Sequence, residues 1–367
     1  MLDLPAGPGF VDALQRVWAT GDAVFPLDQR LPPAEAERVR AVVRPTAVIE
    51  VDGERRSLEG GEPLQAGDAV VVATSGTTGD PKAVIHTHRS VTASSMATSA
   101  ALDVDPTADR WLGCLPPAHI GGLAVIMRSL HTGTPLSVLE QFEPAAAEQA
   151  ARDGATLVSL VTRALNQVDV DLFRIVLIGG AASPPDLPAH VIPTYGMTET
   201  GSGCVYGGYP LDGVELRAAP SGEIEIRADL LLRAYRTADG EVDPRGHDGW
   251  FPTGDLGRVE PDGRLRVDGR AGDMLITGGE NVWPHRIERT LETHPAIVEA
   301  AVIGRPDPDW GHLVTAFVVV EGDAPSVDEV RDWVRRDLPV WNAPKDVIVV
   351  DALPKTAIGK IRKSELR

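Results

Sequence analysis

Short apolar runs alternate with segments of helical spacing through the first half of the chain. The apolar runs, which are rich in valine, isoleucine and leucine, lie at 69–74, 110–116, 135–140, 155–161 and 174–180. The segments of helical spacing lie at 88–102, 121–133 and 143–154. Strands and helices that alternate in this way predict a parallel or mixed sheet that is covered by helices.

The two ends of this pattern are different. Residues 1–65 have weak periodicity, and only 32–43, which open with two prolines, predict a helix there. After about residue 205 the pattern changes to hairpins, because 222–228 and 254–270 alternate apolar and polar side chains. Asp262-Gly263 is expected in a hairpin turn. These segments predict a small β-rich lobe within an N-terminal domain.

The last part of the chain predicts a smaller α+β domain. Pro284 is expected in the first turn of one helix, and 314–320 is expected to be a strand. Ser326 precedes Glu329 by three residues, the spacing of a capping box, which predicts a second helix. The fold class is therefore α/β, with a large N-terminal domain at residues 1–271 and a smaller α+β domain at residues 272–367.

Composition narrows the class of protein. The chain has 367 residues, of which 43% are hydrophobic and 24% are charged, as is ordinary for a globular protein. The formal net charge of −18 opposes a general nucleic-acid or anionic-membrane surface. No secretory signal opens the chain, and no apolar run approaches the roughly 20 residues of a membrane span. Cys114 and Cys204 lack metal-ligand spacing, which favours a reducing, cytoplasmic environment.

Residues 73–88, ATSGTTGDPKAVIHTH, have the composition of an anion-binding loop. Glycines such as Gly76 and Gly79 let backbone N–H groups approach a phosphate, and hydroxyl groups and Lys82 add donors. The spacing is not that of a Walker loop, in which lysine directly follows the second glycine and precedes serine or threonine. His86 and His88 have the spacing of a metal pair, but no third ligand is evident.

Five segments, in order, resemble the motifs of the adenylate-forming acyl-CoA ligase superfamily. They are SGTTGDPK (75–82), YGMTET (195–200), GWFPTGD (249–255), GRAGDMLITGGENVWPHRIE (269–288) and LPKTAIGKIRKSEL (353–366). The resemblance implies two steps. A carboxylate attacks the α-phosphorus of ATP to give an acyl-adenylate and pyrophosphate, and the thiol of coenzyme A then displaces AMP. It also implies a C-terminal domain that is mobile and rotates between the steps.

The resemblance implies which residues bind ATP. Those expected to cradle the β- and γ-phosphates are Thr74, Ser75, Gly76, Thr77, Thr78, Gly79 and Lys82. Those expected to surround the adenine are Gly179, Gly180, Ala181, Tyr195 and Gly196, with the Tyr195 ring stacked on the base. Thr198 would contact the α-phosphate, and Glu199 would help to hold Mg²⁺, a cation that prefers carboxylate oxygens and waters. Asp255 would accept hydrogen bonds from the ribose hydroxyls, beside Arg270.

Other residues are implied in the two steps themselves. The Lys360 ammonium would pair with the attacking carboxylate and with the charge that develops on the α-phosphoryl oxygens, which is electrostatic catalysis without proton transfer. Gly278, Gly279 and Glu280 would face coenzyme A in the second step. The hinge of the rotation would be Gly272, where the superfamily often has aspartate or lysine. Glycine keeps rotation easy but removes any polar contact from this position.

Three segments, LPPAHIGGLAVIMRSL (115–130), LIGGAASP (177–184) and TYGMTETGSGCVYGGYPLDGV (194–214), narrow the resemblance within the superfamily. With them, the compact chain resembles actinobacterial o-succinylbenzoate (2-succinylbenzoate)–CoA ligases of menaquinone biosynthesis, and its N-terminal lobe is expected to be short. The substrate has two carboxylates, so one is activated and the other needs a partner. Arg128, which interrupts an apolar helix, is expected to clamp the second carboxylate. His119, Thr162 and Gly201 are expected to line the acid pocket, and 201–208 is expected to be a loop over the aromatic ring.

The sequence leaves alternatives open for the roles of Arg128 and His119 and for the substrate. Arg128 fits an exposed arginine on a helix surface, and His119 fits a core histidine bonded to the backbone. The acid could be another aryl or acyl acid, such as benzoate, and the acceptor could be a carrier protein. A non-catalytic nucleotide-binding relative is opposed by the presence together of Lys82, Glu199, Asp255, Arg270 and Lys360. A homodimer is expected because closed symmetric pairs are common among such enzymes.

Overall fold

The computed structural model describes residues 1–75, 81–180, 184, 186–355 and 361–366. Two compact units make up the chain. The first comprises Met1–Arg217, Glu225–Pro252 and Val259–Arg266. The second comprises Ala218–Ile224, Thr253–Arg258 and Val267–Arg367. The predicted fold class is confirmed: a larger N-terminal α/β part is followed by a smaller α+β domain.

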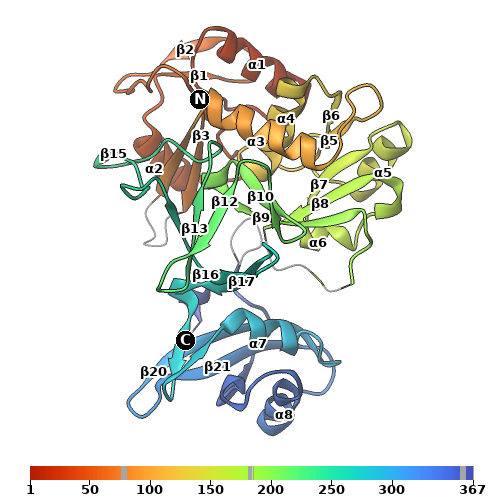
Figure 1. Ribbon diagram of the computed structural model, residues 1–367, viewed down its shortest axis with the longest axis vertical. Helices are drawn as coiled ribbons and strands as arrows, with labels where there is room; N and C mark the ends of the chain where they lie inside the picture. The colour runs from red at the N-terminus through yellow and green to blue at the C-terminus, as the bar shows by residue number, and fades with distance from the viewer. Residues whose placement is uncertain (76–80, 181–183, 185, 356–360, 367) are drawn as a thin grey trace. The chain divides into compact units, whose positions relative to one another are not determined.

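A seven-stranded mixed sheet forms the centre of the first unit (Figure 1), in the order β11-β10-β9-β8-β7-β5-β6. The strands are β5 (Trp111–Gly113), β6 (Leu136–Val138), β7 (Leu157–Val161), β8 (Ile175–Gly179), β9 (Val191–Met197), β10 (Ser202–Tyr206) and β11 (Tyr209–Pro210). Strands β5 to β9 are parallel, and β10 and β11 add antiparallel pairs at one edge. The predicted alternation of strands and helices is therefore confirmed.

The helices of the first unit cover this sheet and its neighbours. They are α1 (Pro8–Ala19), α2 (Pro33–Val43), α3 (His88–Ala101), α4 (Ile120–Thr132), α5 (Pro144–Arg152) and the short α6 (Thr162–Leu165). Helix α2 confirms the prediction for 32–43. Helix α1 was not predicted, although Phe10, Ala13 and Leu14 are spaced for one helix face and are buried against β3 and α4.

A second, four-stranded sheet has the order β15-β14-β4-β3. Its strands are β3 (Asp68–Ser75), β4 (Pro81–Thr87), β14 (Ala234–Thr237) and β15 (Gly240–Val242). The β3–β4 hairpin packs on α2 through buried residues such as Val71 and Ile85. A two-stranded sheet, β1 (Ala47–Ile49) with β2 (Arg55–Ser57), lies in the same N-terminal part.

A third sheet has the order β12-β13-β16-β17, with β12 (Glu215–Ala218), β13 (Glu223–Arg227), β16 (Phe251–Val259) and β17 (Leu265–Arg270). It confirms the predicted hairpins after residue 205. In the β16–β17 turn, the Gly263 N–H donates to the Glu260 carbonyl. The central residues are therefore Pro261 and Asp262, and Gly263 follows them with φ 86°.

The described part of the C-terminal domain is a sheet with helices α7 and α8 (Figure 1). Its strands have the order β19-β18-β21-β20, and β22 pairs with β21. The elements are β18 (Leu275–Thr277), β19 (Glu280–Val282), α7 (Pro284–Leu291), β20 (Ile297–Asp307), β21 (Gly311–Val320), α8 (Val327–Asp337) and β22 (Asp346–Val349). The predicted capping box is confirmed, because Ser326 Oγ accepts from the Glu329 N–H and Glu329 accepts from the Ser326 N–H.

None of the described helices is long and apolar enough to span a membrane.

Candidate functional site

Lys82, Glu199 and Tyr235 make a compact charged cluster in the first unit. Lys82 lies in β4, and Glu199 lies in the short 3₁₀ turn Thr198–Thr200 that follows β9. Lys82 Nζ is 3.0 Å from Glu199 Oε1, and the Tyr235 hydroxyl donates to the same oxygen at 2.7 Å. The Lys82 ammonium also lies 3.7 Å from the centroid of the Tyr235 ring. Two residues predicted for phosphate and Mg²⁺ are thus in direct contact.

Glu199 is an ionised carboxylate in a largely buried place. Glu199 is 9% exposed to solvent. Burial alone would raise the pKa of Glu199, but the Lys82 charge and the hydrogen bonds from Tyr235 and Lys82 outweigh burial and lower the pKa below its ordinary value. An anionic oxygen ligand at neutral pH suits Mg²⁺, so the residue fits its predicted role.

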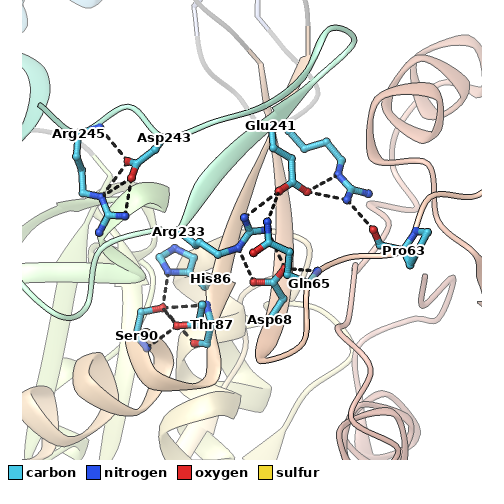
Figure 2. A network of polar contacts seen from close by, with 11 residues as sticks. Pro63, Gln65, Asp68, His86, Thr87, Ser90, Arg233, Glu241, Asp243 and Arg245 are labelled. Atoms are coloured by element: carbon cyan, nitrogen blue, oxygen red, sulfur yellow. Dashed lines mark hydrogen bonds and ion pairs between the residues drawn. The ribbon is translucent and has the colours of Figure 1, made fainter. Parts of the chain in front are cut away.

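His86 supports the turn that carries Glu199. The ring is fully buried, and its Nε2 lies 2.7 Å from the Thr198 carbonyl oxygen. Its Nδ1 lies 3.2 Å from Ser90 Oγ (Figure 2). Because a carbonyl only accepts, Nε2 donates to it. Burial lowers the pKa of His86, against the opposing effects of Thr198 and Glu199, so the ring is neutral at pH 7. His86 therefore positions the 198–200 turn.

The residues predicted around the adenine lie at adjacent strand ends. Gly179 ends β8, Gly180 follows with φ 83°, and Tyr195 and Gly196 lie in the parallel neighbour β9. A Cβ at Gly196 would lie 2.1 Å from the Ser202 carbonyl oxygen, so a larger residue would push β9 and β10 apart. Carboxyl ends of parallel strands are the usual ligand edge of such sheets.

Part of the predicted site lies outside the described residues: Gly76, Thr77, Thr78, Gly79, Ala181 and Lys360. Thr74 and Ser75 end β3, where they pair in register with Lys82 and Pro81. The Thr74 hydroxyl is 3.5 Å from the Lys82 carbonyl oxygen.

Asp255 and Arg270 form an ion pair in the second unit. Arg270 Nε lies 2.9 Å from Asp255 Oδ1, and Arg270 Nη1 donates to the Thr253 carbonyl at 2.8 Å. Asp255 is buried, and its own N–H donates to the Thr253 hydroxyl. The two residues predicted to lie at the ribose are therefore in direct contact with each other.

The residues predicted for coenzyme A and for the hinge are also in the second unit. Gly278 and Gly279, with φ of 58° and 84°, form the two-residue turn between β18 and β19, and Glu280 opens β19. Gly272 lies in a short exposed 3₁₀ turn, without positive φ, and a Cβ there would have no neighbour within 4 Å. The backbone seen here therefore does not itself require glycine at 272.

Arg128 is enclosed in the first unit. It is 1% exposed, so the alternative of an exposed helix-surface arginine is wrong. Its Nη2 donates to Ser202 Oγ at 3.1 Å and to the Tyr206 hydroxyl at 3.4 Å. Its Nε and Nη1 are buried without a hydrogen-bond partner among the described residues, and no described carboxylate pairs with it. A buried cation with unused donors is costly unless an anion joins it.

The other residues predicted for the acid have different surroundings. His119 is the N-cap residue of α4; its Nε2 lies 2.7 Å from Arg30 Nη2 and 3.2 Å from Asp28, and its side chain is 42% exposed. The alternative of a core histidine bonded to the backbone is therefore wrong. Thr162 begins α6, and its hydroxyl is buried without a partner in the described chain. Gly201, with φ 65°, ends the 198–200 turn beside His86.

The expectation of a loop over 201–208 is wrong. Residues Ser202–Tyr206 are strand β10, and Cys204 and Val205 are almost fully buried. Glycines at 201, 203, 207 and 208 suggested a loop, but buried apolar residues between them pair with β9. Only Gly207 and Gly208 form the turn to β11.

Several residues at the site had no local sequence signal. Tyr235 is 36 residues from Glu199, and Ser202 is 74 residues from Arg128 along the chain. Asp28 and Arg30 reach His119 from the N-terminal segment. Only the pairing of strands and helices brings these side chains together.

A cavity of about 310 Å³ in the N-terminal lobe lies apart from the predicted site residues. It is lined by residues such as Phe25, Arg44 and Arg236, but by none of the residues predicted for ATP, acid or coenzyme A.

No ready-made metal centre is found in the described part of the chain. Among the described residues, no group of three or more His, Cys, Asp or Glu side chains is placed to hold a metal ion. A single carboxylate, Glu199, fits a Mg²⁺ that arrives with the phosphates of ATP.

The chain is similar to several known proteins. Residues 58–223 match the AMP-binding enzyme family, and residues 286–360 match the AMP-binding enzyme C-terminal domain. A probable 2-succinylbenzoate–CoA ligase of Mycobacterium tuberculosis is 39% identical, over 87% of this chain and 90% of the relative. A 2-succinylbenzoate–CoA ligase of Bacillus cytotoxicus is 34% identical, over 86% of this chain and 73% of the relative.

Solved structures of similar fold include the same kind of enzyme. The o-succinylbenzoate CoA synthetase of Bacillus subtilis in complex with its acyl-adenylate intermediate has a TM-score of 0.86 and 26% identity, over 100% of this chain and 87% of that one. The same enzyme with ATP and magnesium has a TM-score of 0.78 and 28% identity, over 97% and 82%. The chain therefore belongs to the adenylate-forming, AMP-binding enzyme family, and within it resembles the 2-succinylbenzoate–CoA ligases.

Proposed function

We propose that this protein ligates 2-succinylbenzoate to coenzyme A through an acyl-adenylate, and that it releases pyrophosphate in the first step and AMP in the second. The named ligases among its relatives support this reaction. The observation that carries the choice of acid is the enclosed Arg128, which has unused donors and no carboxylate partner in the described chain.

Arg128 is proposed to bind the carboxylate that is not activated. Its Nη2 contacts Ser202, the residue after Gly201, so the guanidinium lies against the segment that follows the Glu199 turn. A carboxylate would satisfy Nε and Nη1 and neutralise the charge. Thr162, with its unpaired hydroxyl, is proposed as a second polar contact.

The cluster of Lys82, Glu199 and Tyr235 is proposed to bind the phosphates of ATP after the contact between Lys82 and Glu199 breaks. Lys82 would leave Glu199 for the phosphates, and Glu199 would then help to hold Mg²⁺, which neutralises phosphate charge when it is bound. Asp255 would accept from the ribose hydroxyls while Arg270 keeps it oriented. Lys360 would hold the attacking carboxylate against the α-phosphoryl group.

The second step is proposed to involve the C-terminal domain, residues 272–367. Gly272 would act as the hinge, and the Gly278–Gly279 turn with Glu280 would approach the thin pantetheine arm. The exposed, uncrowded position of Gly272 supports this role, since the backbone there is not held by packing. A cytoplasmic location, favoured by two buried unpaired cysteines, and a homodimer complete the proposal.

The test is pyrophosphate release from ATP and Mg²⁺ with 2-succinylbenzoate, with benzoate in parallel and coenzyme A added afterwards. We expect release with the dicarboxylate only, and the thioester after coenzyme A is added. Release with benzoate at an equal rate would remove the proposed acid and keep the adenylate-forming chemistry. Release with neither acid would overturn the proposed substrate.

A further inference from the structure

The contact between Lys82 and Glu199 includes a third residue. The Tyr235 hydroxyl donates to Glu199 Oε1 at 2.7 Å, which is shorter than the 3.0 Å contact from Lys82 Nζ to the same oxygen. The Tyr235 ring also lies under the Lys82 ammonium, at 3.7 Å from its centroid. A phenol therefore contacts both members of the ion pair, one through its hydroxyl and the other through its face.

The sheet fixes Tyr235 in this place. Strand β14 pairs with β4 so that Tyr235 is opposite Val84. Side chains two apart on a strand share a face, so Lys82, Val84 and His86 point to the same side as Tyr235. The 198–200 turn lies on that side, because His86 donates to the Thr198 carbonyl.

The residues that flank Tyr235 anchor its strand (Figure 2). Arg233 binds both oxygens of Asp68, at 2.7 and 2.8 Å, and also Glu241. Arg236 binds Glu241 and the carbonyl oxygens of residues 43, 62 and 63. Strand β14 is thus held on both sides of Tyr235, so its hydroxyl meets Glu199 at a set position.

Both side-chain hydrogen bonds of the cluster fall on one oxygen of the carboxylate, Glu199 Oε1. If ATP draws Lys82 to its phosphates, the Tyr235 hydroxyl keeps its contact with Oε1. The carboxylate then keeps one orientation, and Oε2 is the oxygen that would face a cation.

We propose that Tyr235 is a positioning residue for MgATP: it orients Glu199 toward the cation and holds the Lys82 ammonium against its ring until ATP binds. This inference rests on the proposed function, because it assigns Mg²⁺ to Glu199 and the phosphates to Lys82. Tyr235 itself is not proposed to contact the acid or the reacting phosphorus.

The test is Tyr235→Phe, which keeps the ring under Lys82 and removes only the hydroxyl. We expect the Mg²⁺ concentration at half-maximal pyrophosphate release to rise about tenfold, equivalent to about 1.4 kcal/mol and close to the worth of a hydrogen bond to a charged group. The half-saturating concentration of 2-succinylbenzoate should stay within about twofold.

Tyr209→Phe is the matched control. The Tyr209 hydroxyl also donates to a carboxylate, Asp262 at 3.3 Å, on an exposed surface of the same unit. This variant should behave as the wild type in Mg²⁺ dependence. Equal Mg²⁺ dependence in the two variants would overturn the proposal, as would a loss of stability and rate in Tyr235→Phe with unchanged Mg²⁺ dependence.

ATP binding without any acid separates this proposal from the proposed function. If the wild type releases no pyrophosphate with 2-succinylbenzoate, calorimetry of ATP binding at several Mg²⁺ concentrations still tests the role of Tyr235. A greater Mg²⁺ requirement in Tyr235→Phe would support the inference although the substrate is wrong. Wild-type ATP affinity that is independent of Mg²⁺ would overturn it.

If Tyr235→Phe does not fold, ¹⁹F spectra of the protein labelled with 3-fluorotyrosine replace it. The chain has four tyrosines. Tyr→Phe changes at the other three, Tyr195, Tyr206 and Tyr209, identify the Tyr235 signal by elimination. MgATP should shift this signal, because Lys82 leaves the ring; an unchanged signal at saturating MgATP would contradict the proposal.

Discussion

Arg128 is a guanidinium enclosed by neutral side chains, and its two hydroxyl partners, Ser202 and Tyr206, use only one of its nitrogens. Leaving a charge in this state costs free energy that a bound carboxylate would recover. The many exposed arginines of the chain differ from Arg128, because exposed ion pairs contribute little to stability.

Arg128→Met should lower kcat/KM for 2-succinylbenzoate by about 10- to 100-fold, because hydrogen bonds to a charged group contribute about 1.5–3 kcal/mol. A monocarboxylate such as benzoate should be affected less than about threefold. Pyrophosphate release with each acid measures the difference. The unfolding free energy should stay equal or rise, since an apolar side chain of similar length removes an unpaired buried charge. Equal losses with both acids would contradict the clamp.

His86 links the pH dependence of stability to the Glu199 turn. Burial lowers its pKa in the folded protein, whereas an unfolded histidine has a pKa of about 6.5. As pH falls below about 6.5, the unfolded chain binds a proton that the folded chain does not, so the unfolding free energy falls.

His86→Gln keeps an N–H that can donate to the Thr198 carbonyl but removes this titration. Urea unfolding at about pH 7.5 and about pH 5.5 should show a smaller loss of stability on acidification in the variant than in the wild type. His88 and His285, whose pKa values burial also lowers, contribute equally to both proteins and cancel in the comparison. Parallel losses in the two proteins would show that His86 does not carry the effect.

At the scale of elements, a partly buried network of ion pairs and hydrogen bonds holds β14 and β15 to the N-terminal segment (Figure 2). Glu241 accepts from Arg236 at 2.7 Å and from Arg233 at 2.8 Å, and Arg236 is 2% exposed. Burial alone would raise the pKa of Glu241, but the two arginines outweigh it and lower the pKa. The carboxylate is therefore charged and holds two cations in place.

Glu241→Gln should destabilise the protein by about 2 kcal/mol, because it leaves a buried guanidinium less well paired. Asp243→Asn is the matched control, since Asp243 pairs with Arg245 in a more exposed hydrogen-bonded pair of the same segment. Exposed pairs of this kind contribute about 0–1 kcal/mol. Chemical unfolding of both variants measures the difference, and a Glu241→Gln loss no larger than that of Asp243→Asn would contradict the buried role.

The elements differ in how far the sequence could predict them. Strands β5 to β8 and helices α3 to α5 follow from local periodicity, because each buries one face against its neighbours. Helix α1 was missed because glycine and proline at 5–9 hide its start, and β10 was taken for a loop because of its glycines. The motif residues could be recognised in the sequence. Tyr235 could not, since its role depends on the pairing of β14 with β4.

At the scale of the whole molecule, one active site is proposed to serve two reactions, with Gly272 as the hinge between its two arrangements. Proline at 272 restricts φ and removes the N–H, whereas alanine finds open space there. Gly272→Pro should change one half-reaction by about tenfold or more relative to the other, and Gly272→Ala should change both by less than about twofold. Separate rates for pyrophosphate release and for thioester formation measure this. Equal rates of both steps in the proline variant would contradict the hinge.

The most direct measurement is a quenched single turnover of the enzyme with ATP, Mg²⁺ and 2-succinylbenzoate, followed by mass spectrometry, for the wild type and Lys360→Ala. In the wild type we expect an acyl-adenylate before coenzyme A is added and its conversion to thioester and AMP afterwards. In Lys360→Ala, adenylate formation should fall by at least about a hundredfold, while acyl-adenylate supplied ready-made is still converted to thioester. A thioester that forms without any acyl-adenylate, or with ADP as the product of ATP, would contradict the proposed two-step reaction.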